Sequence, residues 1–294
     1  MSEQQQTLNI DQTLDSAIQQ HMAGHLPQAA ATYQKILKAN SMHPVALHLL
    51  GVITHQMGES DQAIALITKA LSVMPEYAEA HSNLGNVLRE TGRLEDASAS
   101  YRQALALAPD YAEAHYNLAQ TLRELGEIEE AVISCQKAIK IAPDFPEGHN
   151  DVGVLLLDLE KHQEALKSFQ TAISLRPDYA EAHSNLGNTL VDLGKLDDAV
   201  SSYERALTIR PDLAEIHSNL GNAFWGLGRL DEAIASYHRA LAIRPNDRET
   251  HHGLGMAFLD AGQHKDGLRH KRNGSGVIEF STDINRKFAI LGGT

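Results

Sequence analysis

Histidine is the residue whose spacing first suggests chemistry in this chain. Six histidines recur every 34 residues, at His81, His115, His149, His183, His217 and His251. Imidazole is a common protein ligand for metal ions, so a group of converging histidines would suggest a metal site. An even series instead places one ring in each successive unit of the chain. We therefore interpret these histidines as packing residues and expect no metal site.

The rest of the sequence contains no recognisable catalytic motif. It has no phosphate-binding P-loop, no dinucleotide-binding fingerprint after a strand, no nucleophile elbow and no zinc spacing of cysteine and histidine. The carboxylates follow the repeat and do not pair as a general acid and base. Cys135 is the single cysteine, and we expect it to be buried and unreactive. We predict no catalytic residue, no cofactor and no enzymatic activity.

Composition and charge favour a polypeptide partner. The 294 residues carry a formal net charge of −13, whereas nucleic-acid binding usually requires a basic face, so no nucleic-acid partner is expected. The first nine residues lack the basic and apolar regions of a secretory signal. No stretch approaches the about 18 apolar residues of a membrane span. We expect a cytoplasmic protein, without membrane insertion, that binds a protein or peptide.

Three further residue types recur at the same period and outline the elements. Glycine recurs from Gly24 to Gly262, with Glu160 at the one skipped position. Proline recurs from Pro75 to Pro245, and alanine from Ala29 to Ala233. Glycine suits the left-handed end of a helix, and proline blocks the continuation of a helix. Each unit is therefore predicted to be helix, turn, helix, turn, and the fold class is all-α.

One unit, Ala78 to Tyr111, shows the pattern most clearly. Its characteristic positions are His81-x2-Leu84-Gly85-x2-Leu88, Ala97-x3-Tyr101 and Pro109. They resemble the tetratricopeptide repeat (TPR) pattern W-x2-L-G-x2-Y, A-x3-F and P. The resemblance implies an α–α superhelical solenoid of tandem helical hairpins, whose concave surface is lined by the first helix of each hairpin. We also expect the two helices of this hairpin to approach closely where the small residues Gly85 and Ala97 lie.

The repeat pattern also predicts the domain organisation. We expect a flexible N-terminus over residues 1–9 and a TPR array over 10–263. The units of the array start at residues 10, 44, 78, 112, 146, 180 and 214, with a partial eighth unit from 248. The pattern then fails, because Gly267 and Lys271 stand where alanine and an aromatic residue are expected.

Residues 264–294 are accordingly predicted to be a non-TPR tail. Short strands are expected at 277–280 and 288–291. The tail could cap the array, begin a further domain or act as a linker.

Asparagine recurs on the first helices at positions that packing does not obviously require. One position holds Asn83, Asn117, Asp151, Asn185 and Asn219. Three residues further on stand Asn86, Gln120, Asn188 and Asn222. Residues i and i+3 share a helix face, and a side-chain amide offers both donors and an acceptor. These nine residues, called the amide series below, are predicted to bind an extended peptide on the concave face.

A second resemblance concerns the same positions. The motif Ser82-Asn83-Leu84-Gly85-Asn86 resembles the repeats of O-linked N-acetylglucosamine transferases. In that family an inner asparagine series contacts the peptide main chain, which implies the same role for Asn83, Asn117, Asn185 and Asn219. Asp151 interrupts the series. The alternative interpretation is that these amides bond within or between helices and only fix the stacking of the repeats.

Two functions follow from these predictions. The first is an interaction scaffold that binds an extended peptide or partner segment in the concave groove of a TPR superhelix. The alternative is the substrate-recruiting arm of a glycosyltransferase-like enzyme whose catalytic domain is not part of this sequence. Self-association through the end repeats is a third option, because an exposed end repeat can stack on its copy.

Overall fold

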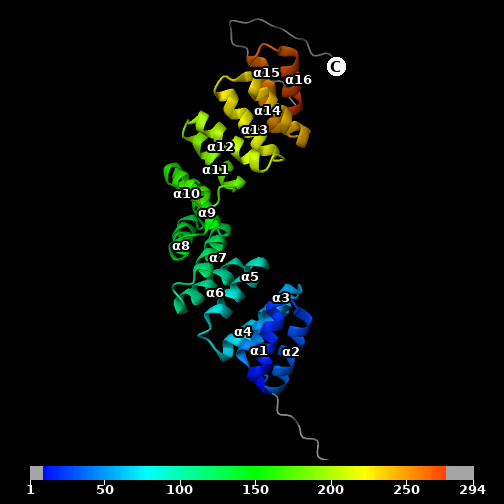
Figure 1. The fold of residues 1–294 in the computed structure, drawn as a ribbon, viewed down its shortest axis with the longest axis vertical. Coiled ribbons are helices and arrows are strands. Elements are labelled where there is room, and N and C mark those ends of the chain that lie inside the picture. The colour runs from blue at the N-terminus through cyan, green and yellow to red at the C-terminus, as the bar shows by residue number, and fades with distance from the viewer. Residues whose placement is uncertain (1–8, 276–294) are drawn as a thin grey trace, which may run out of the picture. The chain divides into compact units, whose positions relative to one another are not determined.

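The computed structural model describes residues 9–275, and every regular element in that range is an α-helix. This confirms the all-α prediction. The chain divides into two compact units, one ending at Glu160 and one beginning at Lys161. The first unit contains α1–α9 and the second contains α10–α16 (Figure 1).

The helices alternate between the first and the second helix of a hairpin. The odd-numbered first helices are α1 (Ile10–Met22), α3 (Pro44–Gln56), α5 (Ala78–Glu90), α7 (Ala112–Glu124), α9 (Pro146–Asp158), α11 (Ala180–Asp192), α13 (Ala214–Gly226) and α15 (Arg248–Asp260). The even-numbered second helices are α2 (Leu26–Ala39), α4 (Ser60–Val73), α6 (Leu94–Leu107), α8 (Ile128–Ile141), α10 (His162–Leu175), α12 (Leu196–Ile209), α14 (Leu230–Ile243) and α16 (His264–Ser275). The first helices begin at the residues from which the repeat pattern counts its units.

Left-handed glycines end the first helices, as the glycine series predicts. All seven have positive φ, for example +77° at Gly92 and +81° at Gly126. After Gly92, the Arg93 N–H bonds to the Leu88 carbonyl at 2.9 Å and turns the chain into the next helix. Glu160 adopts the same conformation with φ of 57°, although an L side chain disfavours it. Position 160 therefore contains the strain that glycine avoids elsewhere.

The second helix of most hairpins contributes one large apolar side chain to the core. Tyr33, Tyr101, Phe169 and Tyr237 are completely buried in this role. A Cβ added at Gly85 would lie 2.6 Å from the Tyr101 ring, closer than real contacts allow. Helices α5 and α6 pack against each other, and the atoms nearest to Gly85 belong to the Tyr101 ring, which the prediction did not name. The glycine makes room for the tyrosine ring, and the helices pack around that ring.

The last hairpin extends past residue 263, where the sequence pattern fails. Helix α16 packs against α15 as its second helix, although no helix was expected from residue 264. A Cβ on Gly255 would lie 2.8 Å from the Lys271 backbone nitrogen and 3.0 Å from the Gly267 carbonyl oxygen. With glycine at both positions, the two backbones touch directly and no aromatic side chain is needed between them. The strands expected at 277–280 and 288–291 lie outside the described residues.

Candidate functional site

The histidine series fastens each first helix to the turn before it. In each case the ring Nε2 lies 2.9–3.1 Å from the backbone carbonyl oxygen of the proline six residues earlier, as in the pair His115 and Pro109. Since a carbonyl only accepts, Nε2 carries the proton and donates it. Within residues 9–275, no group of three or more histidine, cysteine, aspartate or glutamate side chains could hold a metal ion.

Cys135 occupies the core position that tyrosine fills in other hairpins. Its side chain is completely buried, as expected from the sequence. Burial raises the pKa of its thiol to about 12, and the nearby Asp151 carboxylate adds to the effect. The thiol is therefore protonated at neutral pH and is a poor nucleophile.

The amide series lies on the face formed by the first helices. Within the first unit α3 contacts α5 and α5 contacts α7, and within the second unit α11 contacts α13 and α13 contacts α15. We call these surfaces the first-helix face of each unit. The first unit contributes Asn83, Asn86, Asn117, Gln120 and Asp151, and the second contributes Asn185, Asn188, Asn219 and Asn222. None of the nine is buried, and Asn222 is exposed.

Hydrogen bonds connect the amide series between neighbouring repeats of the first unit. The Asn117 Nδ2 donates to the Asn86 Oδ1 at 3.0 Å, and the Tyr101 hydroxyl donates to the same oxygen at 2.7 Å. One repeat further, Gln120 Nε2 donates to the Asp151 Oδ2 at 2.5 Å. Asp151 thus keeps a bond between neighbouring repeats with donor and acceptor exchanged, because a carboxylate only accepts, and it also accepts from the Tyr116 hydroxyl of α7 at 2.7 Å.

The second unit repeats this arrangement. Asn219 Nδ2 donates to the Asn188 Oδ1 at 3.1 Å, and the Tyr203 hydroxyl donates to the same oxygen at 2.7 Å. The Tyr237 hydroxyl donates to the Asn222 Oδ1 at 2.6 Å. Asn185 lies half-buried on the same face. The amide oxygen at the second position of the series is therefore anchored to the core tyrosine of its own hairpin.

Asn83 has a different partner, because its neighbouring repeat offers no amide. Its Nδ2 lies 2.9 Å from the His48 Nε2, and the His48 Nδ1 lies 2.9 Å from the Tyr77 hydroxyl. Burial, together with the neighbouring His21, lowers the pKa of His48 to about 4. The neutral ring accepts from Asn83 and donates to Tyr77.

These bonds use only part of each amide. Within the part of the chain that the structure describes, no partner contacts the Nδ2 groups of Asn86, Asn188 and Asn222 or the Oδ1 atoms of Asn117 and Asn219. Each bonded pair, Asn86 with Asn117 and Asn188 with Asn219, thus leaves one donor and one acceptor on the accessible side.

Hollows run along the same face. A hollow of about 470 Å³ in the first unit is lined by Asn83 and Asn86. In the second unit, hollows of about 240 and 640 Å³ both reach Asn219 and Asn222. Trp225 lines the larger one, and its Nε1 donates to the Asp260 carboxylate at 2.8 Å.

Sequence reasoning missed the tyrosines that anchor this network. Tyr101, Tyr203 and Tyr237 appear in the sequence only as core residues, yet each hydroxyl reaches the first-helix face. The signal that could have found them is the constant spacing of 15 residues between each asparagine and its tyrosine.

Comparison with family models agrees with this architecture. Models described as tetratricopeptide repeat match residues 43–110, 83–146 and 214–247, and a model described as TPR repeat matches 153–193 and 187–228. The chain belongs to the tetratricopeptide repeat family. A comparison with the curated proteins finds no significant match.

Solved TPR structures resemble this one. A TPR protein described as having an unusual peptide-binding site, YrrB, is 27% identical with a TM-score of 0.57, and the match covers 63% of this chain and 95% of that chain. The MamA protein is 26% identical with a TM-score of 0.56, covering 59% and 94%. A TPR repeat-containing protein from Cytophaga hutchinsonii, 16% identical, shares the fold with a TM-score of 0.68 over 82% of this chain and 99% of that chain.

The TPR repeats, together with the MamA and YrrB structures, support a protein-interaction scaffold as the function of this chain. In residues 9–275, none of the helices has the length and the apolar character that crossing a membrane requires.

Proposed function

We propose that this TPR array binds an extended peptide segment along its first-helix face, with the amide series contacting the peptide main chain. The observation that supports the proposal is the donor and acceptor left over in each bonded asparagine pair. In the first pair Asn86 offers its Nδ2 group and Asn117 its Oδ1, and in the second Asn188 offers its Nδ2 group and Asn219 its Oδ1.

This combination matches the chemistry of a peptide backbone. Each residue of an extended peptide presents one N–H donor and one C=O acceptor, and both lose water when the peptide is bound. A polar group left without a partner would cost about 1–3 kcal/mol. A side-chain amide pair supplies one partner of each kind and is indifferent to the peptide's side chains.

The internal bonds make the site rigid before binding. Tyr101 and Asn117 both hold the Asn86 oxygen, so the free Nδ2 group of Asn86 has a fixed direction. A group that is held in its bound orientation loses little conformational entropy on binding. The two interpretations of the amide series therefore combine, since one half of each amide orders the repeats and the other half is left for a ligand.

The relatives add support without identifying a ligand. YrrB, at 27% identity, is described as a TPR protein with a peptide-binding site. The hollows beside Asn83, Asn219 and Asn222 provide room for the side chains of a peptide on the same face.

The test separates binding from stacking by changing one half of an amide. Asn86→Asp with Asn188→Asp keeps the oxygen that accepts from tyrosine and asparagine, as Asp151 does naturally, but removes the free donor. The probe is a fluorescein-labelled, uncharged 12-residue peptide selected by display against the intact chain. We expect its affinity to fall about tenfold, with little change in the melting temperature.

The matched control lowers stability, while affinity should fall less than in the aspartate variant, because the free donors remain and lose only part of their anchoring. Tyr101→Phe with Tyr203→Phe removes the anchoring hydroxyls and leaves the free donors, so stability should fall by about 1 kcal/mol per bond. Wild-type affinity in the aspartate variant, with an unchanged melting temperature, would contradict the proposal. A peptide methylated on its backbone nitrogens supplies a second check, because it should bind weakly to the wild type.

A further inference from the structure

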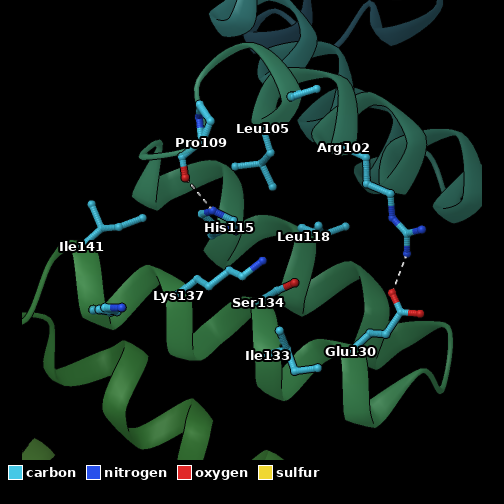
Figure 2. Close-up of a pocket in the computed structure, with 12 residues that line it drawn as sticks. Arg102, Leu105, Pro109, His115, Leu118, Glu130, Ile133, Ser134, Lys137 and Ile141 are labelled. Carbon is cyan, nitrogen blue, oxygen red and sulfur yellow. Dashed lines mark hydrogen bonds and ion pairs between the residues drawn. The ribbon is translucent and has the colours of Figure 1, made fainter.

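A second hollow lies in the first unit, away from the amide series. It has a volume of about 890 Å³ and opens between the second helices α6 and α8, with α7 beneath. Figure 2 shows Arg102 and Leu105 on the α6 side, His115 and Leu118 at the base, and a row of α8 side chains opposite.

The α8 side of this hollow exposes large apolar side chains. Ile133 is 53% exposed and Ile141 is 39% exposed. The equivalent position to Ile133 in the other repeats holds Ala31, Ala65, Ala99, Lys167, Ser201, Ala235 and Arg269. The repeat therefore does not require isoleucine there, and the chain leaves more than half of the Ile133 side chain exposed.

Two lysines accompany these isoleucines. Arg102 pairs with Glu130 at 2.9 Å, which neutralises both charges. Lys137 and Lys140 are exposed and make no ion pair within the described residues. Their charge stands out because the chain as a whole has a formal net charge of −13.

The second unit contains an equivalent hollow whose lining residues can be compared with these. A hollow of about 780 Å³ opens between α12 and α14 at the equivalent positions. There Glu204 replaces Arg102, Ala235 replaces Ile133 and Ala242 replaces Lys140. One cation and two carboxylates line it, against three cations and one carboxylate in the first unit. The shape, the isoleucine at the Ile141 position and a cation at the Lys137 position recur as Ile243 and Arg239, whereas Ile133 and Lys140 are particular to α8.

We propose that this hollow, which we call the α8 groove, binds an acidic amphipathic helix of another protein. The partner's apolar residues would pack on Ile133 and Ile141, and its carboxylates would meet Lys137 and Lys140. Ile133 and Ile141 are eight residues apart on one helix, which is about 12 Å. A partner helix spans that length with apolar residues two turns apart, the usual spacing of helix-in-groove recognition. This site is separate from the peptide site on the first-helix face.

The probe is a 16-residue amphipathic peptide with leucine along one face and glutamate beside it. Two matched peptides replace every glutamate with lysine or every leucine with serine. Methyl NMR of the intact chain labelled at isoleucine reports the site, because Ile133 and Ile141 lie in the α8 groove and Ile243 lies in the equivalent hollow of the second unit.

We expect the acidic peptide to shift the Ile133 and Ile141 methyl signals and to leave Ile243 unchanged. Lys137→Gln with Lys140→Gln, and separately Ile133→Ala, should each weaken binding about tenfold. Arg239→Gln in the second unit should have no effect, and neither should Asn86→Asp. Since all three substituted α8 side chains are exposed, the melting temperature should be retained.

Any of the following results would overturn the proposal. The lysine peptide or the serine peptide could bind as well as the acidic one, or the variants could bind like wild type. The acidic peptide could instead shift Ile243 or no methyl at all. Finally, the Ile133 and Ile141 signals could shift with protein concentration alone, which would make a second copy of this chain the occupant.

Discussion

The contact between Gly85 and Tyr101 allows a quantitative prediction for Gly85→Ala. The added methyl would lie 2.6, 2.8 and 2.8 Å from three atoms of the Tyr101 ring. That ring is completely buried, so it cannot swing into solvent. Forcing such a ring aside costs about 1–3 kcal/mol. Displacing the Tyr101 hydroxyl from Asn86 adds about 1 kcal/mol, which the better helix propensity of alanine offsets by a similar amount.

The expected net loss is therefore about 1–3 kcal/mol, measured by urea denaturation followed by circular dichroism. The next repeat provides the matched background, because Ala119 stands at the equivalent position and Cys135 replaces the tyrosine. In a Tyr101→Cys chain, Gly85→Ala should be neutral or stabilising. An equal loss in both backgrounds would refute the steric reasoning, because the ring would then not be the cause.

The remaining predictions concern single positions. Glu160→Gly should stabilise the chain by about 0.5–1 kcal/mol, because it relieves a left-handed residue, while Gly126→Ala should destabilise it; urea midpoints would show both. His48 has a folded pKa of about 4 against an ordinary value of 6.5, so the unfolded chain binds the proton first as pH falls. The free energy of unfolding should therefore fall by on the order of 3 kcal/mol as pH is lowered from 6.5 to 4. Thermal melts of His48→Gln should lack that part of the pH dependence. Cys135 should react with iodoacetamide at pH 8 at least about 100-fold more slowly in the folded chain than in urea, by mass spectrometry; equal rates would contradict its burial.

The sequence pattern predicts the helices well because each boundary depends on residues with a strong local preference. A glycine at the end of a first helix and a proline after a second helix act within a few residues of the chain. The end of the array was harder to predict. Gly267 and Lys271 look like failures of the pattern, but Gly255 opposite them lets the α16 backbone pack directly on α15. Such compensation between two positions is not visible in either residue alone.

The sequence predicts which helix face the amide series shares, and it does not predict the hydrogen bonds within the series. Periodicity places Asn86 and Asn117 on equivalent faces, but it does not say that one donates to the other. The tyrosine hydroxyls were missed because a core position in the repeat predicts that the ring is buried. It does not predict which hydrogen-bond partner the hydroxyl group reaches. Asp151 shows the same limit, since its carboxylate accepts from Gln120 where Asn117 and Asn219, at the same position, donate.

The histidine series has a consequence for how such a chain can change length. Each histidine bonds to a carbonyl only six residues away, so the joint between hairpins is encoded within one stretch of sequence. A duplication or deletion of one 34-residue unit would carry this joint with it intact. The amide bonds instead connect residues 31 positions apart in neighbouring repeats, so they survive such an event only when the new neighbours match. Recombination is therefore tolerated by the framework of the array, whereas its bonded asparagine pairs depend on the order of the repeats.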